Sequence, residues 1–184
     1  LQLYEDGVME QPGPRLSAAE PKVISECMRS AALWSVGLPD QAAQVGHDII
    51  DFARQLPDPY SLAYTLANGV IRVLGWTGDW DQVKALTEEC GSVADEFGYG
   101  FLGVWASIWR ARAIAQNGHL EEAEKMISGS IAACKNAGVH YHRVTFEANH
   151  ARILLAMNRV DEAATVLDGL DGVLKTGGEL NHEV

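Results

Sequence analysis

The sequence is poor in basic residues: its 184 residues include 14 Lys and Arg against 25 Asp and Glu, and the formal net charge is −11. Nucleic-acid binding normally needs a basic face that meets the phosphates, and an anionic membrane surface attracts the same sign of charge. The composition therefore argues against nucleic acid and against membrane lipid as partners. The hydrophobic content of 47% is that of a globular chain and excludes wholesale disorder.

Long apolar runs and a leader segment are also lacking. No uninterrupted run approaches the roughly 20 apolar residues that cross a bilayer, and the first residues contain neither a basic nor an apolar leader region, so no signal peptide is expected. Cys27, Cys90 and Cys134 are widely separated and form no CxxC pair, which favours buried free thiols over disulfides or a metal site. We expect a cytoplasmic protein. The absence of an initiator Met leads us to expect a fragment of a longer chain.

Motifs that carry catalysis are missing as well. There is no GxxxxGK[ST] phosphate loop, no GxSxG and no Cys/His pairing typical of a nucleophile. His140, His142 and His150 are the one group that could suggest a metal, but the last two lie about two helical turns apart, roughly 11–12 Å, which is too far for one ion. We therefore expect no enzymatic activity, no metal and no cofactor.

What the chain does contain is an internal repeat. Four six-residue segments share a turn-former, two variable residues, an acid, an acid or amide, and a small residue: 37–42, 78–83, 118–123 and 158–163. The last three are spaced by 40 residues. A second marker keeps the same spacing at Asp58, Gly98, Gly138 and Gly178. Two sets of markers in phase over about four copies predict a repeat architecture.

Between the markers, apolar residues recur every three or four positions, which predicts helices, and no β-branched alternation suggests a strand. The predicted helices are 21–36, 40–56, 60–76, 80–97, 100–117, 120–137, 141–157 and 160–176. Pro39 and Pro59 fall where a first helical turn tolerates proline. The fold class is therefore all-α, a solenoid of about four helix pairs with a period near 40 residues. We assign residues 1–20 to the end of a preceding repeat and a connector, and 21–184 to the repeat domain.

Small residues recur where the two helices of a pair should touch. Each second helix opens with one of them, and the first helix carries a matching small residue seven positions before the turn marker in three of the four copies. The two sets are Ala42, Val83, Ala123 and Ala163, and Ser30, Ala111 and Ala151. Ile71 breaks the second set. A large side chain at these positions would push the paired helices apart.

The Gly-x-x-Asp/Glu-Glu-Ala pattern, with small residues at both helix contacts, resembles the tetratricopeptide (TPR) repeat, lengthened from about 34 residues to 40. Segments 32–42, 52–67 and 137–179 are similar to the C-terminal TPR region of large bacterial signalling proteins. In these, an adenylate/guanylate cyclase domain or a LuxR-type transcription regulator is joined to an AAA-like ATPase. The resemblance implies a TPR-like α-α superhelix that binds proteins in signal transduction or transcription regulation, with any catalysis in other domains.

Three arginines, Arg72, Arg112 and Arg152, are spaced by 40 residues, each six positions before its turn marker. By analogy with TPR repeats, this position faces the concave groove. The predicted groove neighbours are Asn68, Trp76, Trp105, Ile108 and Gln116. A row of guanidinium groups suits a carboxylate-bearing peptide or an acidic loop of a partner. The alternative is that each arginine pairs with an acid of an adjacent helix, such as Glu147, and stiffens the stack.

The aromatic residues leave a further alternative open. One set could line a pocket, although aromatics at helical spacing more often form core: Trp105, Trp109, Tyr99, Phe101, Tyr60 and Tyr64. Three functions are therefore compatible with the sequence. The groove may hold a peptide, a partner domain or another domain of the parent chain. A small-molecule effector could enter between the aromatic rows, with Arg as an anion clamp. The chain could also form a homo-oligomer by end stacking through residues 160–184.

Overall fold

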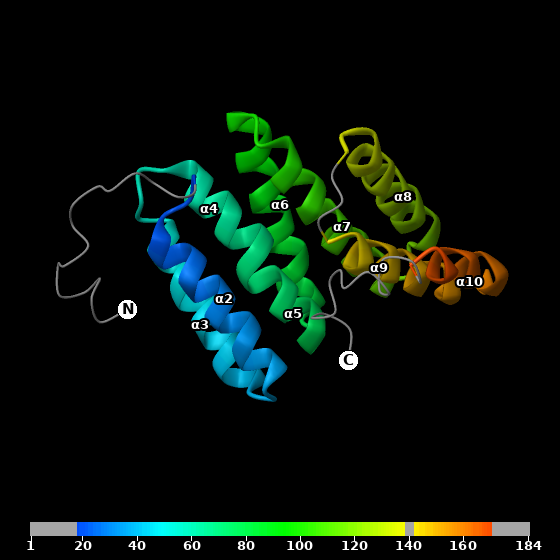
Figure 1. Ribbon diagram of the computed structural model, residues 1–184, viewed down its shortest axis with the longest axis horizontal. Helices are drawn as coiled ribbons and strands as arrows, with labels where there is room; N and C mark the ends of the chain where they lie inside the picture. The colour runs from blue at the N-terminus through cyan, green and yellow to red at the C-terminus, as the bar shows by residue number, and fades with distance from the viewer. Residues whose placement is uncertain (1–17, 139–141, 171–184) are drawn as a thin grey trace.

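The computed structural model describes residues 18–138 and 142–170, and in these residues it contains helices and no strand. Eight helical segments follow one another as four pairs (Figure 1). Their bounds are α2 Pro21–Ser35 and α3 Pro39–Ala53; α4 Pro59–Thr65, η1 Leu66–Val70 and α5 Ile71–Thr77, which are continuous, with α6 Trp80–Phe97; α7 Gly100–Gln116 and α8 Leu120–Asn136; and α9 Arg143–Ala156 and α10 Val160–Asp168. The all-α fold of paired helices is thus confirmed.

The observed helices differ from the predicted ones at two places. The helix predicted over 141–157 begins only at Arg143, because His142 has a left-handed backbone (φ 60°) that cannot continue a right-handed helix. The helix predicted over 60–76 is interrupted by the π-helical turn η1, which the apolar spacing did not reveal. Parts of the predictions, namely residues 1–17, His140 and the segment 171–184, lie outside the described residues.

The turn markers end the first helix of each pair. Gly37, Gly78 and Gly118 have φ of 79°, 84° and 86°, and Asn158 has φ of 60°. Glycine and asparagine accept this left-handed conformation with the least strain, which explains why only these two residue types occur at the marker. The second marker behaves in the same way at Gly98 and Gly138 but not at Asp58, whose side chain instead caps α4 by accepting a hydrogen bond from the Tyr60 N–H at 3.1 Å.

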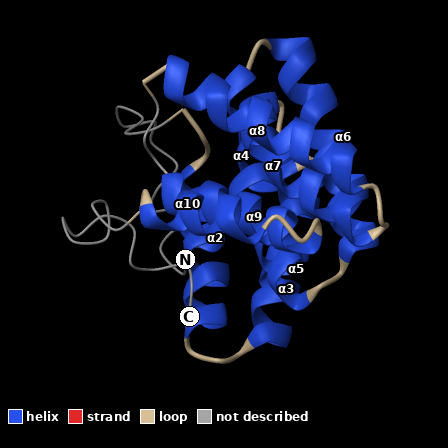
Figure 2. Ribbon diagram, turned by 90° about the vertical axis from the view of Figure 1, so that its right-hand side faces the viewer, coloured by secondary structure: helices blue, strands red, loops and turns tan. Residues whose placement is uncertain are grey.

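The first helices of the pairs form one continuous layer. The α2 helix contacts α4, η1 and α5; the α7 helix contacts η1 and α5 on one side and α9 on the other. Each second helix packs against the first helix of its own pair, so that the pairs succeed one another along the long axis of the molecule (Figures 1 and 2). This arrangement brings positions that are 40 residues apart in the sequence onto neighbouring helices of one layer.

Small residues permit this close pairing. The predicted second-helix residues Ala42, Val83, Ala123 and Ala163 are all buried. The Ser30 hydroxyl donates to the Ala42 carbonyl at 2.8 Å, so the first and second helices of the first pair meet at the predicted positions. In the last pair, Ala151 and Ala163 belong to the same apolar cluster. Ile71, the exception in the repeat, is fully buried in the main core.

The main core runs through the middle of the molecule, from Ile50 at the end of α3 to Ile153 on α9, and smaller clusters occupy the two ends. All three cysteines are buried and free, and burial raises the pKa of the Cys27 and Cys90 thiols to about 12. None of the described helices combines the length and the apolar character that a bilayer crossing requires.

Candidate functional site: a tryptophan–arginine cavity

A cavity of about 400 Å³ lies where first helices of successive pairs meet. Its lining comes from α2, the end of α5 with the turn that follows, the start of α6, and α7 and α9. The lining residues are Trp34, Gly75, Trp76, Thr77, Gly78, Trp80, Trp109, Arg112, Asn149 and Arg152. Four of the five tryptophans of the chain are among them. We refer to this set of residues as the tryptophan–arginine cavity.

One wall of the cavity is a stack of three planar groups. The rings of Trp34 and Trp76 lie 5.2 Å apart at an interplanar angle of 28°, which joins the first pair to the second. The guanidinium carbon of Arg72 lies 5.2 Å from the centre of the Trp76 ring. Because a cation is attracted to the face of an indole, Arg72 helps to hold Trp76 in its orientation.

A second contact of the same kind forms the adjoining wall. The Arg112 guanidinium on α7 lies 5.3 Å from the ring centre of Trp80, the first residue of α6. One helical turn before Arg112, the Trp109 ring lies directly against α5, at Gly75. A Cβ added at Gly75 would lie 2.4 Å from Trp109 Cζ3, so only glycine leaves room for this indole.

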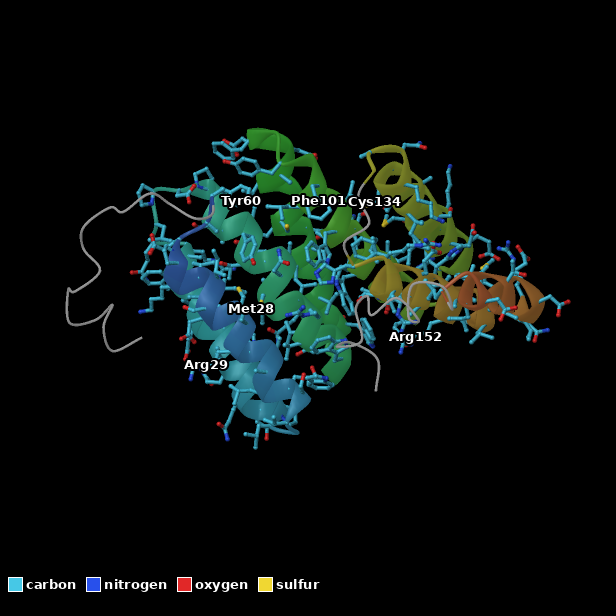
Figure 3. The ribbon with its side chains drawn as sticks, viewed as in Figure 1. Met28, Arg29, Tyr60, Phe101, Cys134 and Arg152 are labelled. Carbon is cyan, nitrogen blue, oxygen red and sulfur yellow. The ribbon has the colours of Figure 1, made fainter. Side chains whose placement is uncertain are left out.

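The three arginines of the predicted row occupy equivalent positions on α5, α7 and α9 but have different surroundings. Arg72 is only 4% exposed and does not line the cavity. Arg112 is half-buried and Arg152 is exposed, and both line it. Figure 3 shows the Arg152 side chain projecting from α9 on the side away from α8. Glu147, the acid suggested as a scaffold partner for this row, forms ion pairs with Lys135 at 2.8 Å and Arg143 at 3.8 Å.

The other predicted groove residues divide between core and surface. Trp76 lines the cavity. Asn68, Trp105 and Ile108 are buried, since they lie on the faces by which η1 and α7 pack into the main core, and Gln116 is exposed beyond the cavity wall. The prediction missed Trp34, Trp80 and Asn149, because none of them lies in the 40-residue frame of the arginines.

The aromatic set proves to be mostly core. Trp105 packs against Phe101, His142 and Phe146, with ring centres 5.6, 4.2 and 6.0 Å away. Tyr60 and Tyr99 form a separate edge-to-face pair at 5.1 Å. Only Trp109 of the set lines the cavity.

The described residues contain no group of three or more side chains placed to hold a metal ion. Of the three histidines considered for such a site, His150 lies 3.4 Å from Glu124 through its Nε2, and His142 belongs to the Trp105 cluster. His140 is not among the described residues.

The cavity carries local positive charge in an acidic protein. Its described lining holds two arginines and neither Asp nor Glu, whereas the whole chain has a net charge of −11. The lining also includes the buried indole of Trp109, whose N–H has no acceptor among the described residues. Guanidinium groups, an indole donor and flat aromatic faces together suit a ligand that has acceptor oxygens and a planar surface.

Comparison with known proteins identifies the fold. No family model matches the chain, and no curated protein matches its sequence. A solved structure from Podospora anserina, described as a kinesin light chain with nearly identical TPR-like repeats, is similar, with a TM-score of 0.54 over 96% of this chain and 86% of that one. Its sequence identity is 17%, so the similarity concerns the fold alone. The chain is accordingly a TPR-like helical repeat region.

Proposed function

We propose that this chain is a non-catalytic protein-interaction module that binds an acidic peptide or an acidic segment of a partner domain along the layer of first helices. The observation that carries the proposal is the placement of Arg112 and Arg152 on neighbouring helices of that layer, lining one cavity. TPR-like repeats serve in general as protein-interaction modules, and they bind on the surface that successive repeats build together.

Charge gives the proposal its specificity. A chain with a net charge of −11 repels acidic partners over most of its surface, whereas the cavity presents two guanidinium groups that bind carboxylates through paired hydrogen bonds. An acidic segment would therefore bind at this place rather than elsewhere. Its affinity should decrease as salt rises, because the exposed Arg152 is screened by ions.

We propose further that the module belongs to a cytoplasmic bacterial signalling or transcription-regulatory protein. The support is the sequence resemblance of segments 32–42, 52–67 and 137–179 to the TPR regions of such proteins. The three buried free thiols suit a reducing compartment. In such a parent, the ATPase or output domain is a natural candidate for the bound partner.

The proposal is tested by fluorescence anisotropy with labelled peptides that differ only in Glu against Gln. The acidic peptides should bind, and Arg112→Ala should weaken their binding by about 1–3 kcal/mol, the range for a hydrogen bond to a charged group. Arg110→Ala is the matched control. Arg110 lies on the same helix, is partly exposed and contacts Glu88 at 3.3 Å, but does not line the cavity. Unchanged affinity together with a lowered melting temperature would assign Arg112 to the scaffold.

Self-association is a second candidate, favoured by exposed apolar side chains on the last pair. Leu155, Val160 and Leu167 are 49%, 55% and 44% exposed. Burial of these side chains against another copy would be favourable. Light scattering across a concentration series decides this: a mass that rises with concentration and falls back in Leu167→Ser supports stacking, and a constant monomer mass rejects it.

A further inference from the structure

We propose that the tryptophan–arginine cavity is a binding site for a small aromatic carboxylate, a free effector molecule that is distinct from the protein partner. The inference goes beyond the interaction function, because it assigns to the cavity a ligand that needs no peptide backbone. It depends on the shape of the cavity, its aromatic walls and its charge.

The size of the cavity suits a ligand of one or two rings. Its volume of about 400 Å³ lies in the range of roughly 300–1,000 Å³ typical of small-molecule sites. Its walls come from three of the four helix pairs together with Trp34 of the remaining one, so a bound molecule would contact all four pairs at once. Pockets between helices are common positions for such ligands.

The walls favour a flat ring over an aliphatic chain. Trp34 and Trp76 stack on one another, Trp80 carries Arg112 over its ring, and Trp109 is fixed against Gly75. These contacts hold the indoles in place before a ligand arrives. An aromatic ligand gains from stacking or edge contacts with such rings beyond the area that it buries, whereas a saturated ring does not.

The charges require a carboxylate on the ring. Arg112 and Arg152 stay cationic at any physiological pH, and the described lining provides no acid to neutralise them. The indole N–H of Trp109 adds a buried donor with no acceptor among the described residues. A monoanion fits better than a phosphate dianion, because Thr77 and Gly78 bring the C-terminal end of α5, with its partial negative charge, to the same cavity.

Isothermal titration of the protein with indole-3-carboxylate and 1-naphthoate tests the inference. Both should bind, and three comparison compounds should bind at least about tenfold more weakly: the matching amides, cyclohexanecarboxylate and phenyl phosphate. Equal affinity for the amides would overturn the role of charge. Equal affinity for cyclohexanecarboxylate would overturn the role of the ring, and tighter binding of phenyl phosphate would overturn the assignment to carboxylates. No heat of binding with any compound would overturn the site itself.

Variants locate the binding. Arg152→Gln, at an exposed position where the fold should tolerate it, should weaken binding of 1-naphthoate about 10- to 100-fold, and Arg112→Gln should act in the same direction. Arg110→Gln, which lies outside the cavity, should leave the affinity unchanged. Circular dichroism confirms that each variant is folded. An equal loss in Arg110→Gln and Arg152→Gln would overturn the inference.

A parallel titration with the acidic peptides separates this inference from the proposed function. Binding of naphthoate without binding of any peptide supports the effector site and rejects the interaction function. Binding of peptides without naphthoate does the reverse.

Discussion

The second and fourth helix pairs carry an arginine at the same repeat position but give it opposite surroundings. Arg72 is 4% exposed on α5, which packs between α2 and α7, and its guanidinium lies over Trp76. Arg152 is exposed on α9, which contacts α7 among the first helices. In a solenoid each repeat is buried only by its neighbours, so the period sets where a side chain lies on its helix, and the number of adjacent pairs sets how far it is buried.

The same contrast extends to the apolar contacts. The middle pairs share one continuous core, whereas the described part of the last pair contributes a small cluster around Ala151, Leu154 and Ala163. We infer that the middle pairs supply most of the folding free energy and that the inner ends of α7 and α9 are freer to meet a ligand. The three predictions that follow test this division.

The largest effect is expected from Ile71→Ala. This change restores the small residue that Ser30, Ala111 and Ala151 provide in the other pairs, so the repeat pattern alone suggests that it is harmless. Ile71 is nevertheless fully buried in the main core, and its truncation should lower the free energy of unfolding by about 2–5 kcal/mol, measured by urea denaturation.

Leu155→Ala is the control for Ile71→Ala. Leu155 is exposed on the last pair, so its truncation should change the free energy of unfolding by no more than about 0.5 kcal/mol. If Ile71→Ala were equally neutral, the division between middle and end would be wrong.

A smaller effect is expected from Gly75→Ala. The new methyl group would overlap Trp109, which must shift, so the variant should lose about 1–3 kcal/mol even though alanine favours helix. Near-ultraviolet circular dichroism should change with it. Gly129→Ala is the matched control, because Gly129 lies within α8 with open space around it and should gain about 0.5–1 kcal/mol. Gly75→Ala that stabilised as much as Gly129→Ala would show that Trp109 is not held in place by α5.

The sequence was sufficient to predict the pairs, because the residues that define them act locally. A left-handed helix end requires Gly or Asn, and a tight helix contact requires a small side chain, so both leave a trace at fixed spacing. The predicted contact between Ser30 and Ala42 is confirmed for the same reason. The register of the three arginines on α5, α7 and α9 also follows from the period.

The cavity could not be predicted, because its members follow no common spacing. Trp34 and Trp80 enter it from the end of one helix and the start of another, and their approach depends on how successive pairs rotate. The turn η1 was missed because Leu66 and Val70 fit a π-helix and an α-helix equally well in an apolar pattern. Its position is set by packing: a Cβ on Gly46 of α3 would lie 2.7 Å from the Val70 side chain, so α3 and η1 approach closely there.

The smallest effect concerns Asp58, which takes the place of Gly98 and Gly138 in the second marker. Its carboxylate accepts from the Tyr60 N–H at 3.1 Å and from the Ser61 hydroxyl at 2.7 Å, and Ser61 in turn accepts from the Glu20 N–H at 2.8 Å. Asp58 thereby connects the start of α4 to the start of α2. Asp58→Ala should lose about 1 kcal/mol, the usual contribution of an N-cap, in urea denaturation.

Asp79→Ala is the comparison for Asp58→Ala, because Asp79 caps α6 by accepting from the Gln82 N–H at 3.2 Å and its contacts stay within that helix. Its loss should be smaller, about 0.5 kcal/mol, since the bonds that it makes are exposed whereas those of Asp58 are partly buried. Equal losses would mean that the link through Ser61 to Glu20 contributes nothing and that contacts between the first two pairs depend on apolar packing alone. A larger loss at Asp58 would show that the middle of the molecule is stabilised by polar contacts between pairs as well as by its core.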